Sequence, residues 1–140
     1  MSVVAPNASS KPSVSRRRLR FPRRIRLLKH ADFERVYKQG LRHFAAHITV
    51  FYLARSHGQG LRVGFTVGRV LGGAVDRNRM KRRLREAVRL LLPEKPAPVD
   101  VVINPKKSML GIEFAMLEKE VSRAFDVIQK FAEKLPPAAE

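Results

Sequence analysis

Apolar residues recur at spacings of three and four between residues 76 and 91, which is the periodicity of an α-helix with one buried face. The apolar positions are Met80, Leu84, Ala87, Val88 and Leu91. At about 100° per residue, Lys81, Arg82, Arg85 and Arg89 lie on the opposite side, with Arg79 and Arg83 on a flank. The pattern predicts a helix that buries one face and holds a dense cationic face outward. Asp76 is expected to cap its start.

The same periodicity predicts two further helices. Residues 31–39 should form a short helix with Phe33, Val36 and Tyr37 on one side, and Gly40 should end it. Residues 111–134 should form a long helix that packs one face on a sheet, followed by Pro136 and Pro137. Its apolar positions are Phe114, Leu117, Val121, Phe125, Ile128 and Leu135.

Strands are predicted where β-branched and aromatic residues gather, at residues 47–54, 61–70 and 99–104. The first two are separated by a turn-like segment with Ser56, Gly58 and Gly60, so we expect them to pair as an antiparallel hairpin. Residues 41–44 are a candidate for a shorter strand. This order of helices and strands predicts an α+β fold with one domain over residues 25–135. Residues 136–140 are expected to form a tail.

Charge changes this picture, because the 140-residue chain carries a formal net charge of +17. Such a charge opposes compaction and favours a polyanionic partner, with nucleic acid first. Residues 1–24 are rich in Ser, Pro and Arg and are expected to form a disordered basic arm. The arm either follows an RNA backbone or only aids solubility, and we favour RNA contact. The candidate RNA contacts of the arm are Arg16, Arg17, Arg18, Arg20, Arg23 and Arg24, together with Arg26 just after it.

Several kinds of chemistry find no support in the sequence. The absence of cysteine excludes disulfides and thiolate zinc sites, and the four histidines lack metal-ligand spacing. The acidic residues are too scattered for a two-metal nuclease, so we expect neither a catalytic nor a metal site in the protein itself. No apolar run reaches the roughly 20 residues that span a bilayer, and the N-terminus lacks the apolar segment of a secretory signal. We expect a cytoplasmic protein, although the Arg-rich, acid-free start also has the character of a transit peptide.

Residues 72–86 resemble the signature of the bacterial ribonuclease P protein component. The family pattern Ala-Val-x-Arg-Asn-x-x-Lys-Arg-x-x-Arg is met at Ala74, Val75, Arg77, Asn78, Lys81, Arg82 and Arg85. The order of the other elements is also similar over residues 25–130, including Leu61-Arg62-Val63-Gly64 and the late Val-Val-Ile strand. One departure is that Arg69-Val70 stands where the family often has consecutive lysines.

The resemblance implies an α/β sandwich whose four-stranded mixed sheet is packed by helices, similar to domain 2 of ribosomal protein S5, with a left-handed strand–helix–strand crossover. It implies a protein subunit that, with a catalytic RNA, removes the 5′ leader of precursor tRNA. The hydrolysis would use Mg²⁺ held mainly by the RNA, and no cofactor bound by a protein motif. The implied RNA-binding residues are Arg69, Arg77, Asn78, Arg79, Lys81, Arg82, Arg85 and Arg89. The implied cleft for the single-stranded leader is formed by Phe33, Tyr37, Thr49 and Phe51.

Other functions remain open at this point. A ribosomal protein or general RNA chaperone also fits the charge and fold class, and it would bind RNA without accelerating leader removal. A DNA-binding module is less favoured, because no helix-turn-helix half-site reader is recognisable. The basic helix could also lie on an anionic membrane, but its apolar stripe lacks Trp and Phe and the predicted sheet needs that stripe as core. A merely solvated cationic face is the least favoured reading. For Phe33 and Tyr37 the residues alone favour a core role, and only the resemblance favours contact with RNA bases.

Overall fold

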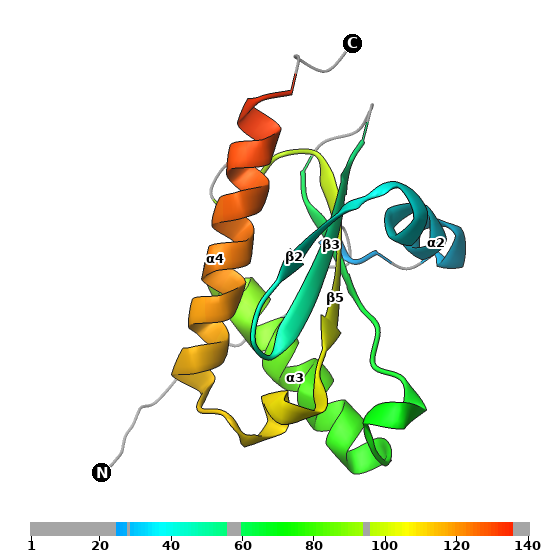
Figure 1. Ribbon diagram of the computed structural model, residues 1–140, viewed down its shortest axis with the longest axis vertical. Helices are drawn as coiled ribbons and strands as arrows, with labels where there is room; N and C mark the ends of the chain where they lie inside the picture. The colour runs from blue at the N-terminus through cyan, green and yellow to red at the C-terminus, as the bar shows by residue number, and fades with distance from the viewer. Residues whose placement is uncertain (1–24, 28, 56–59, 94–95, 136–140) are drawn as a thin grey trace, which may run out of the picture.

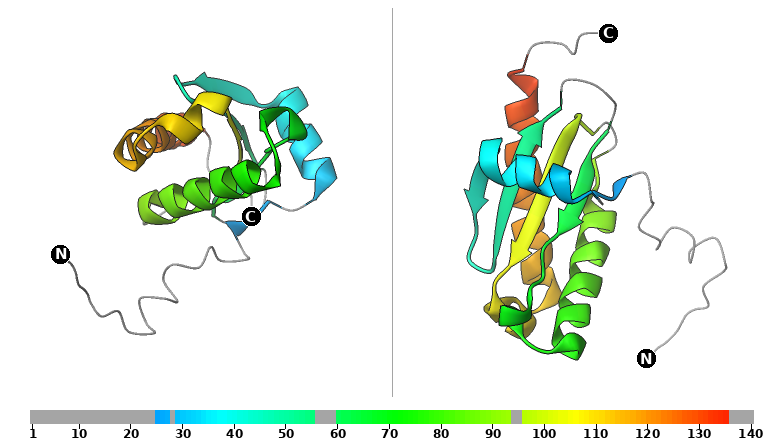
Figure 2. Two further views of the ribbon diagram at one scale, coloured as in Figure 1. Left: turned by 90° about the horizontal axis from the view of Figure 1, so that it is seen from below. Right: turned by 90° about the vertical axis from the view of Figure 1, so that its right-hand side faces the viewer.

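The computed structural model of the protein describes residues 25–27, 29–55, 60–93 and 96–135. These residues form a four-stranded mixed sheet with helices on both of its faces (Figure 1). The short helix α2 lies on one face of the sheet, and α3 and α4 lie on the other (Figure 2). The α-helices of this part of the chain are α2 (His30–Gln39), α3 (Ala74–Leu91) and α4 (Phe114–Glu133). The sheet strands are β2 (Leu41–Phe44), β3 (Ile48–Ala54), β4 (Arg62–Phe65) and β5 (Val99–Pro105). The predicted arm of residues 1–24 and the predicted tail of residues 136–140 lie outside the described residues.

The strand order is β2-β3-β5-β4, which contradicts the predicted hairpin between the segments at 47–54 and 61–70. The hairpin is instead formed by β2 and β3, whose register pairs Leu41 with Tyr52. β5 lies between β3 and β4, antiparallel to β3 and parallel to β4. The candidate strand at residues 41–44 is therefore confirmed, while β4 is a four-residue strand and not the ten-residue strand predicted.

The chain passes from β4 to β5 through a short 3₁₀ turn, η2 (Arg69–Leu71), and then α3. Seen with α2 in front, β4 and β5 run downward with β4 to the right of β5, and α3 returns behind the sheet (Figure 2). This crossover is left-handed, against the usual rule for parallel strands, as the resemblance implied. Helix α3 begins at Ala74 with Gly73 as its N-cap residue. Asp76 therefore does not cap the helix as predicted, but contributes an acidic side chain to its first turn.

The sheet separates two apolar clusters because alternate residues of each strand face opposite sides. Ile48, Val50 and Tyr52 of β3 pack towards α3 and α4 in the larger cluster. On the other face, Leu27 and Val36 pack on Val102 in a smaller cluster beneath α2. The predicted apolar stripe of α3 is confirmed, because Met80, Leu84, Ala87 and Val88 are buried and Leu91 packs against the same core.

Two helix ends differ from the expectation. The long helix begins at Phe114 and ends at Glu133, and a second 3₁₀ segment, η3 (Lys107–Gly111), precedes it. Gly40 does end α2, but with extended backbone (φ −80°, ψ 169°) and not the left-handed conformation of a C′ glycine. Glycine is required there by close approach, since a Cβ would lie 2.5 Å from the carbonyl oxygen of Val36 and 2.7 Å from that of Tyr52.

Candidate nucleic-acid interface

The outer face of α3 carries most of the predicted cationic residues in exposed positions. Burial of the apolar stripe against α4 and the sheet fixes the rotation of the helix, so the opposite side must face solvent. Exposed side chains on or just before this helix are Arg69, Asn78, Arg79, Arg82 and Arg85, and Lys81 is partly exposed. Among the described residues, none of the five cations in that set has an ion-pair partner. This surface, called the cationic face below, can therefore neutralise phosphates without first breaking internal contacts.

Three arginines of α3 have contacts inside the protein. Arg83 donates hydrogen bonds to the carbonyl oxygens of Met109 (2.8 Å) and Ile112 (2.6 Å), which attaches α3 to the segment before α4. Arg77 is partly buried, and its Nε donates to the carbonyl oxygen of Gly72 at 3.1 Å. Arg89 is 13% exposed and ion-paired with Glu86 at 2.5 Å. Of the predicted RNA contacts, Arg89 is thus the least available, while Arg77 holds the loop before the helix.

That loop turns sharply at Gly72, whose φ of 139° lies where side-chain-bearing residues are rarely found. Gly73 follows in an extended conformation and begins α3. The turn leaves Val70 and Val75 as the most exposed large apolar side chains of the described residues, 90% and 80% exposed. Arg69 is exposed on the same short segment. The tight glycine turn therefore presents the start of α3, with its free backbone amides, at the surface.

The predicted leader residues are brought together on the α2 face of the sheet. Tyr37 of α2 packs edge-on against Phe51 of β3, with ring centroids 4.9 Å apart. The Tyr37 hydroxyl lies 2.9 Å from Asn104 Oδ1 and 2.6 Å from Thr66 Oγ1. Since a phenol has one proton, it can donate to Asn104 and accept from Thr66. Tyr37 is thereby fixed at one flank of α2, with its ring and that of Phe51 partly exposed.

Phe33 lies farther along the same flank of α2, against β4. A Cβ at Gly64 would collide with the Phe33 ring, so glycine at this position makes room for that ring. Phe33 is partly exposed and packs on the smaller cluster, and so has both a core contact and a solvent-facing surface. Thr49 is partly exposed as well, and its strand register places it beside Asn104. All four predicted leader residues therefore lie on one sheet face.

Sequence reasoning missed two neighbours of this set on β2. The register pairs Arg42 with Phe51 and Phe44 with Thr49, so both lie on the same face as the predicted residues. The Arg42 guanidinium carbon lies 5.3 Å from the centre of the Phe51 ring, within the range of a cation–π contact. Phe44 is 67% exposed. The alternation of Arg42 and Phe44 along the chain indicates that both side chains lie on one face of a strand. Placing them beside Phe51 and Thr49 requires knowing that this strand pairs with β3.

We call the surface formed by these residues the open sheet face. Helix α2 covers one end of this side of the sheet, and the opposite end is left uncovered (Figure 1). It comprises Phe33, Tyr37, Arg42, Phe44, Thr49, Phe51, Thr66 and Asn104. The loop from β4 through η2 to the start of α3 lies at this uncovered end (Figure 2). The open sheet face and the cationic face are therefore close neighbours at the start of α3.

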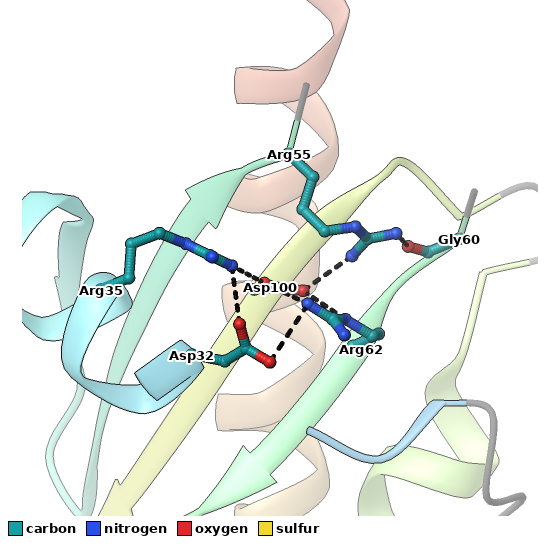
Figure 3. A network of polar contacts seen from close by, with 6 residues as sticks. All are labelled: Asp32, Arg35, Arg55, Gly60, Arg62 and Asp100. Carbon is teal, nitrogen blue, oxygen red and sulfur yellow. Dashed lines mark hydrogen bonds and ion pairs between the residues drawn. The ribbon is translucent and has the colours of Figure 1, made fainter. Parts of the chain in front are cut away.

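A charged cluster at the opposite flank of α2 was also missed (Figure 3). Asp100 of β5 is completely buried and accepts four hydrogen bonds of 2.7 to 2.8 Å from Arg35, Arg55 and Arg62. Asp32 is 3.2 Å from Arg35 and 3.7 Å from Arg62. The sequence signal was a lone acidic residue within an apolar strand, because a buried carboxylate requires a cationic partner.

The electrostatics of this cluster favour the ionised carboxylate. Burial is the largest influence and raises the pKa of Asp100, but the hydrogen bonds and charges of Arg62 and Arg55 together hold it below its usual value. The hydrogen bond to Asp100 correspondingly raises the pKa of Arg62. Asp100 therefore ties α2, through Arg35, to β4 and the end of β3. This fixes the angle of α2 over the sheet and so the position of the open sheet face.

Within the described part of the chain, no three His, Asp or Glu side chains are grouped as metal ligands. No helix of that part is long and apolar enough to span a bilayer.

Exposed aromatic rings beside a cationic helix are typical of proteins that bind a polyanion with unpaired bases. The chain belongs to the ribonuclease P protein family, whose sequence model, described as Ribonuclease P, matches residues 21–129. This confirms the resemblance seen at Ala74 to Arg85, and makes the chain a protein component of an endoribonuclease of tRNA processing.

Named relatives support the same assignment. The chain is 41% identical over 101 residues to the ribonuclease P protein component of Symbiobacterium thermophilum, covering 72% of this chain and 88% of the relative. It is 35% identical over 123 residues to that of Desulfovibrio desulfuricans, covering 86% and 92%.

Solved structures confirm the fold. The ribonuclease P protein of Staphylococcus aureus superposes with a TM-score of 0.66 at 24% identity, covering 74% of this chain and 94% of that chain. The protein of Thermotoga maritima gives a TM-score of 0.61 at 24% identity, covering 71% and 94%.

Proposed function

We propose that the chain binds the catalytic RNA of ribonuclease P through the cationic face, and the 5′ leader of precursor tRNA through the open sheet face. The observation that carries the proposal is that the loop before α3, where the cationic face begins, lies at the end of the sheet that α2 leaves uncovered. A single-stranded leader on the sheet and a folded RNA against the helix would then meet at one end of the protein. The phosphodiester hydrolysis belongs to the RNA with its Mg²⁺, and the protein assists by binding.

The chemistry of each surface suits its proposed partner. Arginine and lysine neutralise phosphates with little regard for base identity, which positions an RNA without reading its sequence. The rings of Tyr37 and Phe51 offer stacking surfaces, and stacking tolerates any base because every base has an aromatic face. Arg42 adds a cation beside Phe51, so a backbone phosphate next to a stacked base has a partner. These properties suit leaders of varied sequence.

The protein then acts by adding positive charge where substrate and catalytic RNA meet. Two polyanions repel each other, and either Mg²⁺ or protein cations can screen that repulsion. The proposal therefore assigns the protein a larger effect at low Mg²⁺. It also places the chain in the cytoplasm of a bacterium, in a complex with the catalytic RNA and precursor tRNA and without contact to DNA or membrane.

The test is cleavage of precursor tRNA by a bacterial ribonuclease P RNA at low Mg²⁺, with and without the full chain. Strong stimulation is expected, and it should shrink when Mg²⁺ is raised. The double variant Arg82→Gln/Arg85→Gln should require more protein for the same stimulation. The matched control Lys119→Gln/Lys130→Gln removes two exposed cations from α4 and should behave as wild type. RNA binding without any stimulation would refute the subunit role and favour a ribosomal or chaperone-type protein.

A further inference from the structure

A concave site lies on the flank of α2 opposite to the open sheet face. It is a cavity of about 450 Å³ between α2 and the ends of β3 and β4. Its lining residues are Lys29, Asp32, Arg35, Gln39, Leu53, Ala54, Arg55 and Arg62. Four of these residues, Asp32, Arg35, Arg55 and Arg62, belong to the charged cluster around Asp100 (Figure 3). This cavity, called the arginine pocket below, shares none of the residues of the cationic face or of the open sheet face.

The charges around the arginine pocket do not balance. Its lining contains four cations and one carboxylate, and Asp100 beneath them adds a second carboxylate. The excess is therefore two positive charges. A cluster built only to bury Asp100 would need fewer cations, since each additional one must be held against the repulsion of its neighbours. This surplus of positive charge favours an anionic ligand.

The pocket also keeps hydrogen-bond donors for such an anion. Asp100 engages Nη2 of Arg35, Nη1 of Arg55, and both Nε and Nη2 of Arg62. Arg35 and Arg62 remain 40% and 30% exposed, and a guanidinium has five donors, so each has further N–H groups that Asp100 does not engage. Within the described residues Lys29 has no ion-pair partner, and it is exposed at the rim.

Buried Asp100 makes these donors a preorganised set. Because it holds three guanidinium groups in fixed positions, a ligand need not order those long side chains itself. Planar guanidinium groups match the oxygens of phosphate in particular. The volume exceeds that of a single phosphate and falls in the range of small-molecule sites, so it can hold a phosphate with an attached group.

We propose that the arginine pocket binds a phosphate-class oxyanion, with Lys29, Arg35 and Arg62 as its principal ligands. The source is either a phosphate of an RNA strand or a free pyrophosphate-like anion, which share this chemistry. The site is independent of the proposed binding of catalytic RNA and leader, because it uses neither of those surfaces.

The experiment titrates the full-length protein with sodium pyrophosphate at low ionic strength and follows the Nε–H NMR signal of Arg62. This signal reports on the pocket, whereas anions bound elsewhere would shift other arginines. We expect the Arg62 signal to shift in a saturable manner. In Lys29→Gln/Arg35→Gln the affinity should fall on the order of tenfold or more, because charge-assisted hydrogen bonds are lost.

The matched control is Lys38→Gln/Lys119→Gln, which removes two exposed cations outside the pocket, one of them on α2 itself. Its pyrophosphate affinity should stay near that of the wild type. If the double pocket variant does not fold by circular dichroism, the single variant Lys29→Gln replaces it, since exposed Lys29 has no ion pair to lose. Equal loss in pocket and control variants, or an Arg62 signal that does not move, would overturn the proposal.

Two RNA oligonucleotides then identify the source of the phosphate. They share one sequence, and one carries a 5′-phosphate while the other carries a 5′-hydroxyl. If only the phosphorylated strand competes with pyrophosphate at Arg62, the ligand is a terminal phosphate. Competition by both strands identifies a backbone phosphate, and competition by neither, with pyrophosphate still bound, identifies a free anion. Each of these three outcomes upholds the oxyanion site.

Discussion

Removing two arginines from the cationic face should lower the salt dependence of RNA binding by a predictable amount. Five cations at this face have no ion-pair partner within the described residues: Arg69, Arg79, Lys81, Arg82 and Arg85. If each neutralises one phosphate, log K should fall by roughly 3.5–4.5 per decade of salt. The variant Arg82→Gln/Arg85→Gln leaves three contacts, for which the slope is roughly 2.1–2.7.

These slopes translate into affinities that are easily distinguished. Between 50 and 200 mM salt, the wild type should lose affinity by about 130-fold to 500-fold and the double variant by only about 20-fold to 40-fold. Both arginines are exposed, so the substitutions should change the free energy of unfolding little. Filter binding or fluorescence anisotropy with the catalytic RNA at several salt concentrations gives both slopes.

The matched control for this experiment is Lys119→Gln/Lys130→Gln on α4, which changes the net charge equally. Its slope should equal that of the wild type. A slope that falls equally in both double variants would mean that net charge, and not the cationic face, governs binding. An unchanged slope in Arg82→Gln/Arg85→Gln would refute the assignment of phosphate contacts to α3.

Three further predictions follow from the contacts of the α2 face. Gly64→Ala should destabilise the fold by about 1–3 kcal/mol in urea unfolding, because its Cβ collides with the Phe33 ring; unaltered stability would contradict that packing. Asp100→Asn should lower the free energy of unfolding by about 3 kcal/mol at pH 7, because the arginines lose their buried counter-charge. The pKa of Asp100 is lowered in the folded protein, so its stabilisation is present above the unfolded pKa of about 3.9 and is lost as pH falls through the folded pKa. The free energies of unfolding of the wild type and of Asp100→Asn should therefore converge in acid. Phe51→Ala should weaken binding of leader-bearing precursor tRNA by about 1–3 kcal/mol and leave binding of mature tRNA unchanged; an equal loss for both RNAs would exclude leader stacking.

Apolar periodicity was sufficient to predict the helices, because each buries a stripe whose spacing is visible in the chain. The register of α3 followed from Met80, Leu84 and Val88, and its outward cations followed from that register. Helix starts were less predictable, because they depend on backbone conformation. Asp76 has the character of an N-cap residue, yet the extended conformation of Gly73 begins the helix three residues earlier.

Strand pairing could not be predicted in the same way. The segments at 47–54 and 61–70 are neighbours in sequence, and consecutive strands usually pair, but β5 inserts between them. The hairpin that does form turns through Ala45, Ala46 and His47, none of which is a typical turn residue. His47 is held there by Glu120 of α4, whose Oε1 accepts a hydrogen bond from the His47 backbone N–H and whose Oε2 lies 2.6 Å from the His47 Nδ1. A contact across 73 residues leaves no local signal.

The candidate site likewise has a part that could be predicted from local periodicity and a part that depends on strand pairing. The cationic face was predictable because it is the complement of one helix's apolar stripe. The leader residues came from family resemblance, since nothing local distinguishes Tyr37 and Phe51 from core aromatics. Arg42, Phe44 and the arginine pocket were missed because they depend on which strands are neighbours.

The central position of β5 also determines when the protein can fold during synthesis. β4 has no strand partner in the sheet until residues 99–105 have left the ribosome, and Arg35, Arg55 and Arg62 lack their shared carboxylate until then. Of the described elements up to β4, the β2–β3 hairpin and α2 are formed by neighbouring residues, whereas most of the larger apolar cluster lies later in the chain. Arg35, Arg55 and Arg62 are thus without that shared counter-charge for much of translation. Completion of the sheet by β5 is the step that gives those arginines their shared carboxylate and sets their positions.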